Sequence, residues 1–376
     1  MAVLFSCPRL WAQDFGLILD QTAAGYGGSQ GDGIFDYEGT LIPRYSTFLG
    51  DNGELYISAG LKVEILNGTT TVLPEILRTE FSWYFDIGDL KAGRMYYSAP
   101  LPFIAEGLFD GASFSFDTAM GSVSIGAWYT GLLYKKRINI TMTLDELLSC
   151  YSKLDYGNFA DTYFAPRRFI AALDWEYPDL LDLVRVKLAL LGQFDLSGGK
   201  LNSQYLAAQF AMPFKAFVID LGGCLEMIQD SDDSGLAFAG ELGFGWMLPA
   251  FAVFDQSQLT LLGRYSSGTV KDSDVRAFQP VTSMDQGDVL KARLSDLSMI
   301  SLDYTARFNR NVSAGLSTSF FLNSEDSFFG NEFFGKFYWS PTSDLWLNLG
   351  CGVFIPYKEY FGNVWRLELN VVLSIY

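Results

Sequence analysis

Apolar and polar residues alternate strictly along the last stretch of the chain, from Asn363 to Tyr376. The apolar positions that share one face are Trp365, Leu367, Leu369, Val371, Leu373 and Ile375. The polar positions on the other face are Arg366, Glu368, Asn370 and Ser374. A period of two residues is typical of a β-strand with one apolar and one polar face. The stretch exceeds the ~5–6 residues of an ordinary strand and reaches the roughly 9–11 residues that a tilted strand needs to cross a bilayer.

The same pattern recurs along the chain and predicts further strands joined by turns and loops. Within residues 72–85, for example, Leu77 and Phe81 are expected on one face, with Arg78 and Glu80 on the other. The predicted strands comprise residues 14–21, 36–49, 54–66, 72–85, 90–97, 111–117, 122–133, 163–177, 180–196, 204–213, 217–229, 236–248, 258–266, 294–309, 312–322, 333–339, 344–354 and 364–376. Short and longer connections alternate, and an even strand count brings both chain ends to one side, as in closed antiparallel barrels.

The neighbouring strands 163–177 and 180–196 allow a check of the pattern. A turn at Pro178-Asp179 places Tyr177 opposite Leu180, and the charged positions of the two strands then share one face. Their apolar positions share the other face, which a shift of one residue would not allow. The two segments are therefore predicted to form a hairpin.

The amino-acid composition indicates whether this sheet lies in water or in a membrane. Aromatic residues make up 16% of the chain and charged residues 18%, against about 25% charged residues in soluble domains. No apolar run approaches the ~20 residues of a membrane-spanning helix; the best candidate, Leu242–Phe254, is short and interrupted by Pro249. In lipid, a closed barrel is the other way to pair all backbone groups. We therefore predict an all-β, transmembrane, antiparallel up-and-down barrel of about 18 strands, with 16 as the alternative count, formed by residues 14–376 as a single domain.

The C-terminal strand that ends at Tyr376 resembles the assembly signal of bacterial outer-membrane β-barrel proteins. This resemblance implies an outer-membrane location, contact with outer-membrane lipid and recognition by the barrel assembly machinery. Residues 1–13 resemble the end of a secretory signal peptide with a cleavage site near Ala12 or Gln13, although the charged first region is missing. We expect this segment to be a processing remnant, with a lipidation site at Cys7 as the alternative.

The residue types that are present limit the kinds of catalytic and binding site that the chain can form. The chain has no histidine, which removes the usual nucleophile–histidine pairs and the commonest metal ligand. The net charge of −17 disfavours binding to nucleic acid, because phosphate groups require an excess of Lys and Arg. Four cysteines (Cys7, Cys150, Cys224, Cys351) lack the spacing of a metal site. We expect no enzymatic activity, catalytic residue, metal or cofactor, and interpret the Asp174 and Glu176 pair as ordinary wall charges.

Charged residues alternate with the apolar series in many predicted strands. A charge near the middle of the lipid face costs roughly 2–4 kcal/mol, so these side chains are expected to point into the barrel. The predicted pore-lining residues are Lys62, Glu64, Arg78, Glu80, Arg168, Asp174, Glu176, Arg185, Lys187, Glu241, Arg264, Asp303, Arg307, Lys336, Arg366 and Glu368. Both signs occur in similar numbers, which favours pairing along the wall over a dedicated binding ladder.

Three connections between predicted strands have unusual sequences. The Gly-rich stretch Gly25–Gly33 is expected to be an external loop. The segment Tyr134–Asp161 contains a capping-box pattern at Thr143–Glu146 that predicts a short helix, and its mixed charges suit an exposed cap. The segment Ser98–Phe109 is nearly uncharged and apolar, so exposing it to water would be costly. We expect it to fold inward as a constriction loop, with packing on the barrel rim as the alternative; its key residues are Pro100, Pro102, Phe103, Glu106 and Phe109, and Glu106 is expected to be a charge in the lumen.

In its layout the chain resembles porins. The resemblance implies an outer-membrane channel for passive or substrate-selective diffusion of small hydrophilic solutes. One alternative is an adhesin or structural barrel that acts through its external loops. Another is a transporter of hydrophobic substrates, for which an apolar lumen and an N-terminal plug would be expected. The sequence does not define the solute, the ion preference or the oligomeric state.

Overall fold

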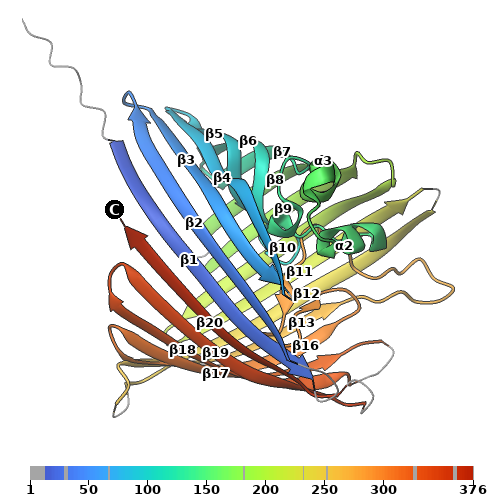
Figure 1. Cartoon of the computed structure of the whole chain (residues 1–376). Coiled ribbons are helices and arrows are strands. Elements are labelled where there is room, and N and C mark those ends of the chain that lie inside the picture. The colour runs from blue at the N-terminus through green and yellow to red at the C-terminus, as the bar shows by residue number, and fades with distance from the viewer. Residues whose placement is uncertain are drawn as a thin grey trace, which may run out of the picture.

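The computed structural model describes residues 13–28, 33–66, 68–180, 183–231, 233–250, 253–324, 328–358 and 362–375. Eighteen antiparallel strands form one closed sheet. The first strand, β1 (Gln13–Gly28), pairs with the last, β20 (Val364–Ile375), from Leu17–Ile375 to Gly28–Val364. Figure 1 shows β1 in blue beside β20 in red. The predicted fold class and the count of 18 strands are confirmed.

The remaining barrel strands pair in chain order. They are β2 (Ile34–Leu49), β3 (Gly53–Leu66), β4 (Thr69–Phe85), β5 (Gly88–Ser98), β6 (Glu106–Thr118), β7 (Gly121–Tyr129), β8 (Arg168–Leu180), β9 (Val184–Asp195), β10 (Leu201–Phe214), β11 (Phe217–Asp230), β12 (Asp233–Leu248), β13 (Gln256–Ser266), β16 (Ser298–Asn309), β17 (Val312–Leu322), β18 (Gly330–Thr342) and β19 (Leu345–Pro356).

Connections differ in length between the two ends of the barrel. At the end that we term the turn end, strands are joined by short links such as residues 86–87 and 310–311. We term the opposite end the loop end. Its connections include residues 99–105, 130–167 and 267–297, and the last two contain helices or short strands of their own. The 130–167 connection contains α1 (Lys135–Ile138), α2 (Leu144–Tyr151), η1 (Tyr156–Asn158) and α3 (Phe159–Tyr163), and the 267–297 connection contains the paired strands β14 (Asp285–Gln286) and β15 (Ala292–Arg293). None of the helices in the described part of the chain is long and apolar enough to cross a membrane.

Exposure identifies the two faces of the sheet. Leu190 and Leu206 are paired across β9 and β10 and are 53% and 52% exposed, whereas the next pair, Ala189 and Ala207, is 3% and 2% exposed. The same alternation places large apolar side chains on the outside of most strands. Lipid contact requires such an apolar outer belt, because polar side chains would lose their hydrogen bonds to water there.

A β-bulge in β4 changes which residues face inward. The pairing of β3 with β4 shifts between Ile57 and Ala59, so the alternation in β4 changes phase. Ile76 is therefore exposed by 60%, whereas Leu77 is only 8% exposed. The expectation that Leu77 shares the outer face with Phe81 is wrong, because strict alternation cannot foresee a bulge.

Two other sequence expectations also need correction. The turn between β8 and β9 is not at Pro178-Asp179: Tyr177 pairs with Val186, and Leu180 pairs with Val184. As far as Tyr177 both schemes pair odd with even residues, so the assignment of faces survives the error there; the register shifts between Tyr177 and Leu180. Gly25 to Gly28 belong to β1 rather than to an external loop, and a Cβ atom at Gly27 would lie only 3.1 Å from the Trp365 ring. Cys7, the rest of the first twelve residues and Tyr376 lie outside the described residues.

Thiol chemistry can test the assignment of faces. Cys351 is exposed on the outer face of β19, and Asn348 lies on the inner face of the same strand, where its amide faces Asn370. In lipid vesicles, a variant with Cys351 as its sole cysteine should react with an apolar pyrene maleimide and not with a membrane-impermeant, charged maleimide.

The matched control is Asn348→Cys in a chain without other cysteines. We expect the opposite preference, because that thiol would face water inside the barrel. Equal labelling of both variants by the charged reagent would contradict the assigned faces.

Candidate functional site

The connection 99–105 between β5 and β6 crosses the interior of the barrel. Leu101 lies against β11, since a Cβ atom at Gly222 would be 2.3 Å from its Cδ2 atom. Phe103 reaches β13, where the Arg264 guanidinium lies 6.0 Å from its ring centre. Both side chains are fully buried. A segment that starts at β5 and contacts β11 and β13 must lie inside the closed sheet.

Two other loop-end connections meet this segment inside the barrel and join it by hydrogen bonds. Val281 donates its backbone N–H to the Ile104 carbonyl (2.8 Å), and the Thr282 hydroxyl accepts from the Glu106 backbone N–H (2.8 Å). Ser283 donates its backbone N–H to the Asn139 carbonyl (3.0 Å). Residues from the three connections and the inner wall form one apolar cluster, which includes Leu101, Phe103, Ile104, Ile138, Ile140, Met142, Phe278, Val281, Ala207, Cys224 and Ala239.

A carboxylate from the wall anchors the 267–297 connection at one side. Glu332 of β18 accepts three consecutive backbone N–H groups, from Asp288 (2.6 Å), Val289 (2.9 Å) and Leu290 (2.8 Å). The turn that presents them includes Gly287 at φ 82°, where a side chain would also collide with the Glu332 carboxylate. Hydrogen bonds to an ionised acceptor are roughly twice as strong as neutral ones.

A second anchor holds the same connection to β10 and β11. The Gln279 backbone N–H donates to Glu226 (2.8 Å), and the Tyr205 hydroxyl donates to the Gln279 carbonyl (2.6 Å). Arg293 donates to the Gln279 side chain (2.6 Å) and to the Thr141 carbonyl (2.5 Å), which ties two connections together. Burial lowers the pKa of the Arg293 guanidinium.

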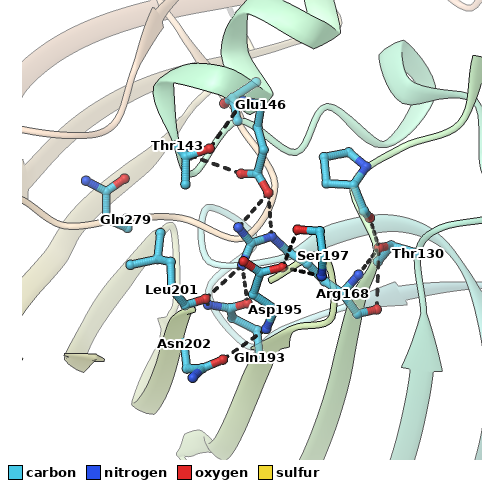
Figure 2. Close-up of polar contacts among 12 residues, drawn as sticks. Thr130, Thr143, Glu146, Arg168, Gln193, Asp195, Ser197, Leu201, Asn202 and Gln279 are labelled. Carbon is cyan, nitrogen blue, oxygen red and sulfur yellow. Dashed lines mark hydrogen bonds and ion pairs between the residues drawn. The ribbon is translucent and has the colours of Figure 1, made fainter. Parts of the chain in front are cut away.

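The 130–167 connection is fixed by an ion pair that starts from the predicted helix cap. Thr143 and Glu146 form the capping box of α2, as the sequence predicts. The second carboxylate oxygen of Glu146 accepts from Arg168 of β8 at 2.6 and 3.0 Å. Arg168 is fully buried and also donates to Gln193 (2.6 Å) and the Leu201 carbonyl (3.1 Å), as Figure 2 shows. One arginine thus joins a loop helix to two neighbouring strands of the wall.

Only part of Tyr134–Asp161 forms the expected exposed cap: Leu144, Leu148 and Tyr151 are exposed, whereas the first residues of the segment are largely buried. Its basic run pairs with the inner wall: Lys136 lies 3.0 Å from Glu64, and Arg137 lies 2.6 Å from Glu75. Lys135 is buried and donates to the Ser152 hydroxyl (2.7 Å), and burial lowers the pKa of its ammonium group. Buried charges need partners, and these acidic residues of β3 and β4 provide two of them.

Most of the predicted pore-lining residues lie beside a partner of opposite charge. The pairs are Lys62–Glu64 (2.7 Å), Arg78–Glu80 (2.8 Å), Arg264–Glu241 (3.2 Å), Lys336–Asp288 (2.8 Å), Arg366–Glu368 (2.6 Å), and Arg185 and Lys187 with Glu176 (both 3.6 Å). Asp174 accepts from the Tyr97 hydroxyl (3.4 Å) and Asp303 from Ser301 (3.0 Å). Arg307 is exposed near the turn end and has no ion pair within the described ranges. Pairing of wall charges is therefore the dominant arrangement.

The residues of the predicted constriction loop separate into three groups. Phe103 and Phe109 are fully buried, and Phe109 belongs to β6. Pro100 and Pro102 line a cavity of about 510 Å³. The Glu106 carboxylate accepts from the hydroxyl of Tyr96, whose side chain is exposed on the side of β5 opposite to the buried Tyr97. This position differs from the expected charge in the lumen, because pairing with Ser98 turns Glu106 toward Tyr96.

Sequence reasoning missed Glu75, Glu226, Glu332 and Arg293. Glu226 and Glu332 do occupy the polar positions of alternating strands, so their face could have been predicted. Their partners are backbone groups of distant loops, for which the sequence contains no signal.

Among the described residues, no cluster of three or more His, Cys, Asp or Glu side chains could hold a metal ion.

Comparisons with known proteins give matches among solved structures only, since neither a family model nor a curated protein matches. Pseudomonas aeruginosa OccK2 (OpdF) superposes with a TM-score of 0.67 at 11% identity, covering 96% of this chain and 97% of that chain. OccK5 (OpdH) from the same organism gives 0.64 at 10% identity, covering 96% and 98%. OccK11 (OpdR) gives 0.60 at 12% identity, covering 96% of each chain. Similar structures also include OpdK with vanillate and OccK2 with glucuronate.

Such low identity establishes a likeness of fold over nearly the whole chain. These structures are outer-membrane porins with a closed 18-stranded barrel. The chain therefore has the fold of bacterial outer-membrane porins.

Proposed function

We propose that the protein is an outer-membrane channel through which small hydrophilic solutes diffuse, and that its three inserted connections narrow the passage. The observation that carries this proposal is the combination of a polar, charge-paired inner wall with segment 99–105 and the buried parts of the connections 130–167 and 267–297, which pack inside the same closed barrel. A barrel of 16–18 strands is wide enough to leave an aqueous channel. Without inserted segments, such a channel would select little.

The distribution of polarity supports a hydrophilic solute. The inserted segments pack on apolar parts of the wall, mainly on β8–β12 and, through Val289 and Leu297, on β17–β19, and this contact covers the apolar surface. Two cavities inside the barrel carry charged and polar groups. The 510 Å³ cavity is bordered by Ser, Asp, Glu and Lys side chains of β5–β10 as well as by apolar residues such as Met95 and Trp128, and a second cavity of about 410 Å³ is bordered by Asp288, Lys336, Glu368 and Asn370. A hydrophobic substrate would have to displace water from these charged groups.

The similar structures with bound ligands are consistent with this proposal at the level of ligand size. OpdK was crystallised with vanillate and OccK2 with glucuronate, which are both small organic molecules. We also propose that the predicted pore-lining residues border this passage. Their charges would keep the passage hydrated, and their pairing along the wall would limit the net electrostatic field inside the barrel.

Purified protein in planar lipid bilayers should produce discrete, ohmic conductance steps. We expect small steps for a barrel of this width, because the inserted segments fill part of the cross-section. Persistent absence of steps from protein that shows β-type circular dichroism and heat-modifiable migration in gels would contradict the channel and favour a surface barrel that acts through its loops.

Releasing the anchor at Glu332 should widen the passage. In Glu332→Gln, the three backbone N–H groups of residues 288–290 lose an ionised acceptor, and hydrogen bonds to charged groups contribute about 1.5–3 kcal/mol each. We expect a higher mean conductance with frequent transitions between levels, measured on single channels.

A matched control for this variant is Glu54→Gln. Glu54 lies near the turn end of β3 and interacts with Tyr84 at the surface, far from the three connections in the fold. Its conductance should equal that of the unmodified protein. Equal conductance of Glu332→Gln and the unmodified protein would argue against the 267–297 connection as the barrier.

A further inference from the structure

The cavity of about 510 Å³ lies inside the barrel between the 99–105 connection and the wall. Ser98, Ala99, Pro100 and Pro102 border it on one side. The strands β5–β10 border it on the other side through Lys91, Ser113, Ser115, Ser122, Ser124, Asp174, Glu176, Lys187 and Gln209. Its volume falls within the roughly 300–1,000 Å³ of small-molecule sites. We term this cavity the serine chamber, after the four serines of β6 and β7.

Both lysines of the serine chamber are already paired. Lys187 lies 3.6 Å from Glu176, and Lys91 lies 3.7 Å from Glu80. A free anion would therefore have to compete with a wall carboxylate for either ammonium group. It would also approach Asp174, whose negative charge has no cation within 4 Å in the described part of the structure. These charges disfavour an anionic ligand.

Several polar groups of the chamber retain hydrogen-bonding capacity. Among the residues that the structure describes, Asp174 accepts a single, long hydrogen bond, from Tyr97 (3.4 Å). The Trp128 indole N–H is buried and has no acceptor in the same part of the chain. Ser115 and Ser124 bond to each other (2.7 Å), which leaves further lone pairs on both hydroxyls. Donors and acceptors are therefore both available, as a ligand with several hydroxyl groups requires.

The chamber also has apolar surface. Ala99, Pro100 and Pro102 present mainly carbon atoms on the side of the 99–105 connection, and the two prolines stiffen that segment. Met95, Tyr97 and Trp128 add apolar surface on the wall. A cavity that combines hydroxyl and carboxylate groups with apolar surface matches a sugar ring, which has hydroxyl groups at its edge and C–H groups on its faces. We propose that the serine chamber binds a neutral polyhydroxylated ring of monosaccharide size in preference to the corresponding sugar acid, with Asp174 accepting hydrogen bonds from its hydroxyl groups. This inference rests on the proposed function, because it assumes that solutes reach the interior.

The test compares glucose with glucuronate, which differ by one carboxylate. Binding to purified protein in detergent is measured by saturation-transfer NMR, and interruption of single-channel current is measured in bilayers. We expect glucose to bind and to interrupt the current, and glucuronate to do so at least several-fold more weakly. Equal or stronger binding of glucuronate would overturn the inference while leaving the channel intact.

The variant Asp174→Asn removes the charge and keeps the size of the side chain. Loss of hydrogen bonds to a charged acceptor should weaken glucose binding by about tenfold or more. The matched control is Asp220→Asn, because Asp220 is on the inner face of β11 and does not border the chamber. Unchanged glucose binding in Asp174→Asn, or an equal loss in Asp220→Asn, would contradict the assigned role.

The two readouts separate the two proposals. Glucose binding by NMR without any conductance would contradict the channel function and support the chamber as a binding site. Conductance without detectable glucose binding would support the channel and overturn the inference about the chamber.

Discussion

Backbone polar groups have no water to bond with in the core of a bilayer, and the rest of this structure depends on that constraint. It is met by the pairing of β1 with β20, which closes the sheet and leaves no free edge. Closure also determines the width of the interior, and 18 strands enclose more space than the side chains of the wall can fill. The connections that fold inward are thus a consequence of the strand number as much as of their own sequences.

An inserted connection must satisfy its own backbone groups in a partly dry interior, and this requirement explains the anchors. Glu332 accepts three backbone N–H groups, and Glu226 accepts a fourth from Gln279. Arg168 pairs with Glu146 and so fixes the 130–167 connection through a side chain rather than through its backbone. Each of these side chains comes from a strand, whose position the sheet fixes, so a rigid wall supplies the partners that an irregular segment lacks.

The sequence predicts the barrel well because its signal is local and repeated. Alternation with a period of two residues assigns the faces of β9, β10 and β20 without knowledge of any neighbour. The prediction fails where a single residue changes the phase, as in the bulge of β4, and where turn position depends on pairing beyond the turn itself, as between β8 and β9. Lys136 and Arg137 appeared suited to an exposed cap because the sequence around them does not predict their ion pairs. Their partners, Glu64 and Glu75, precede them by more than sixty residues along the chain.

The same reasoning explains where the inserted segments pack on the inner wall. The inner wall of β8–β12 offers small apolar residues such as Ala189, Ala207 and Cys224, against which Leu101 and its neighbours can pack closely. The 267–297 connection also packs on β17–β19, where Val289 and Leu297 share a cluster with Phe334. Other parts of the wall carry paired charges such as Arg366–Glu368, and covering them would remove these charges from water. Apolar packing and hydration of the charged wall therefore act together, and they leave two cavities with charged and polar side chains inside the barrel. In the proposed channel, a solute would pass these cavities, so the pattern that packs the connections would also determine the path of the solute.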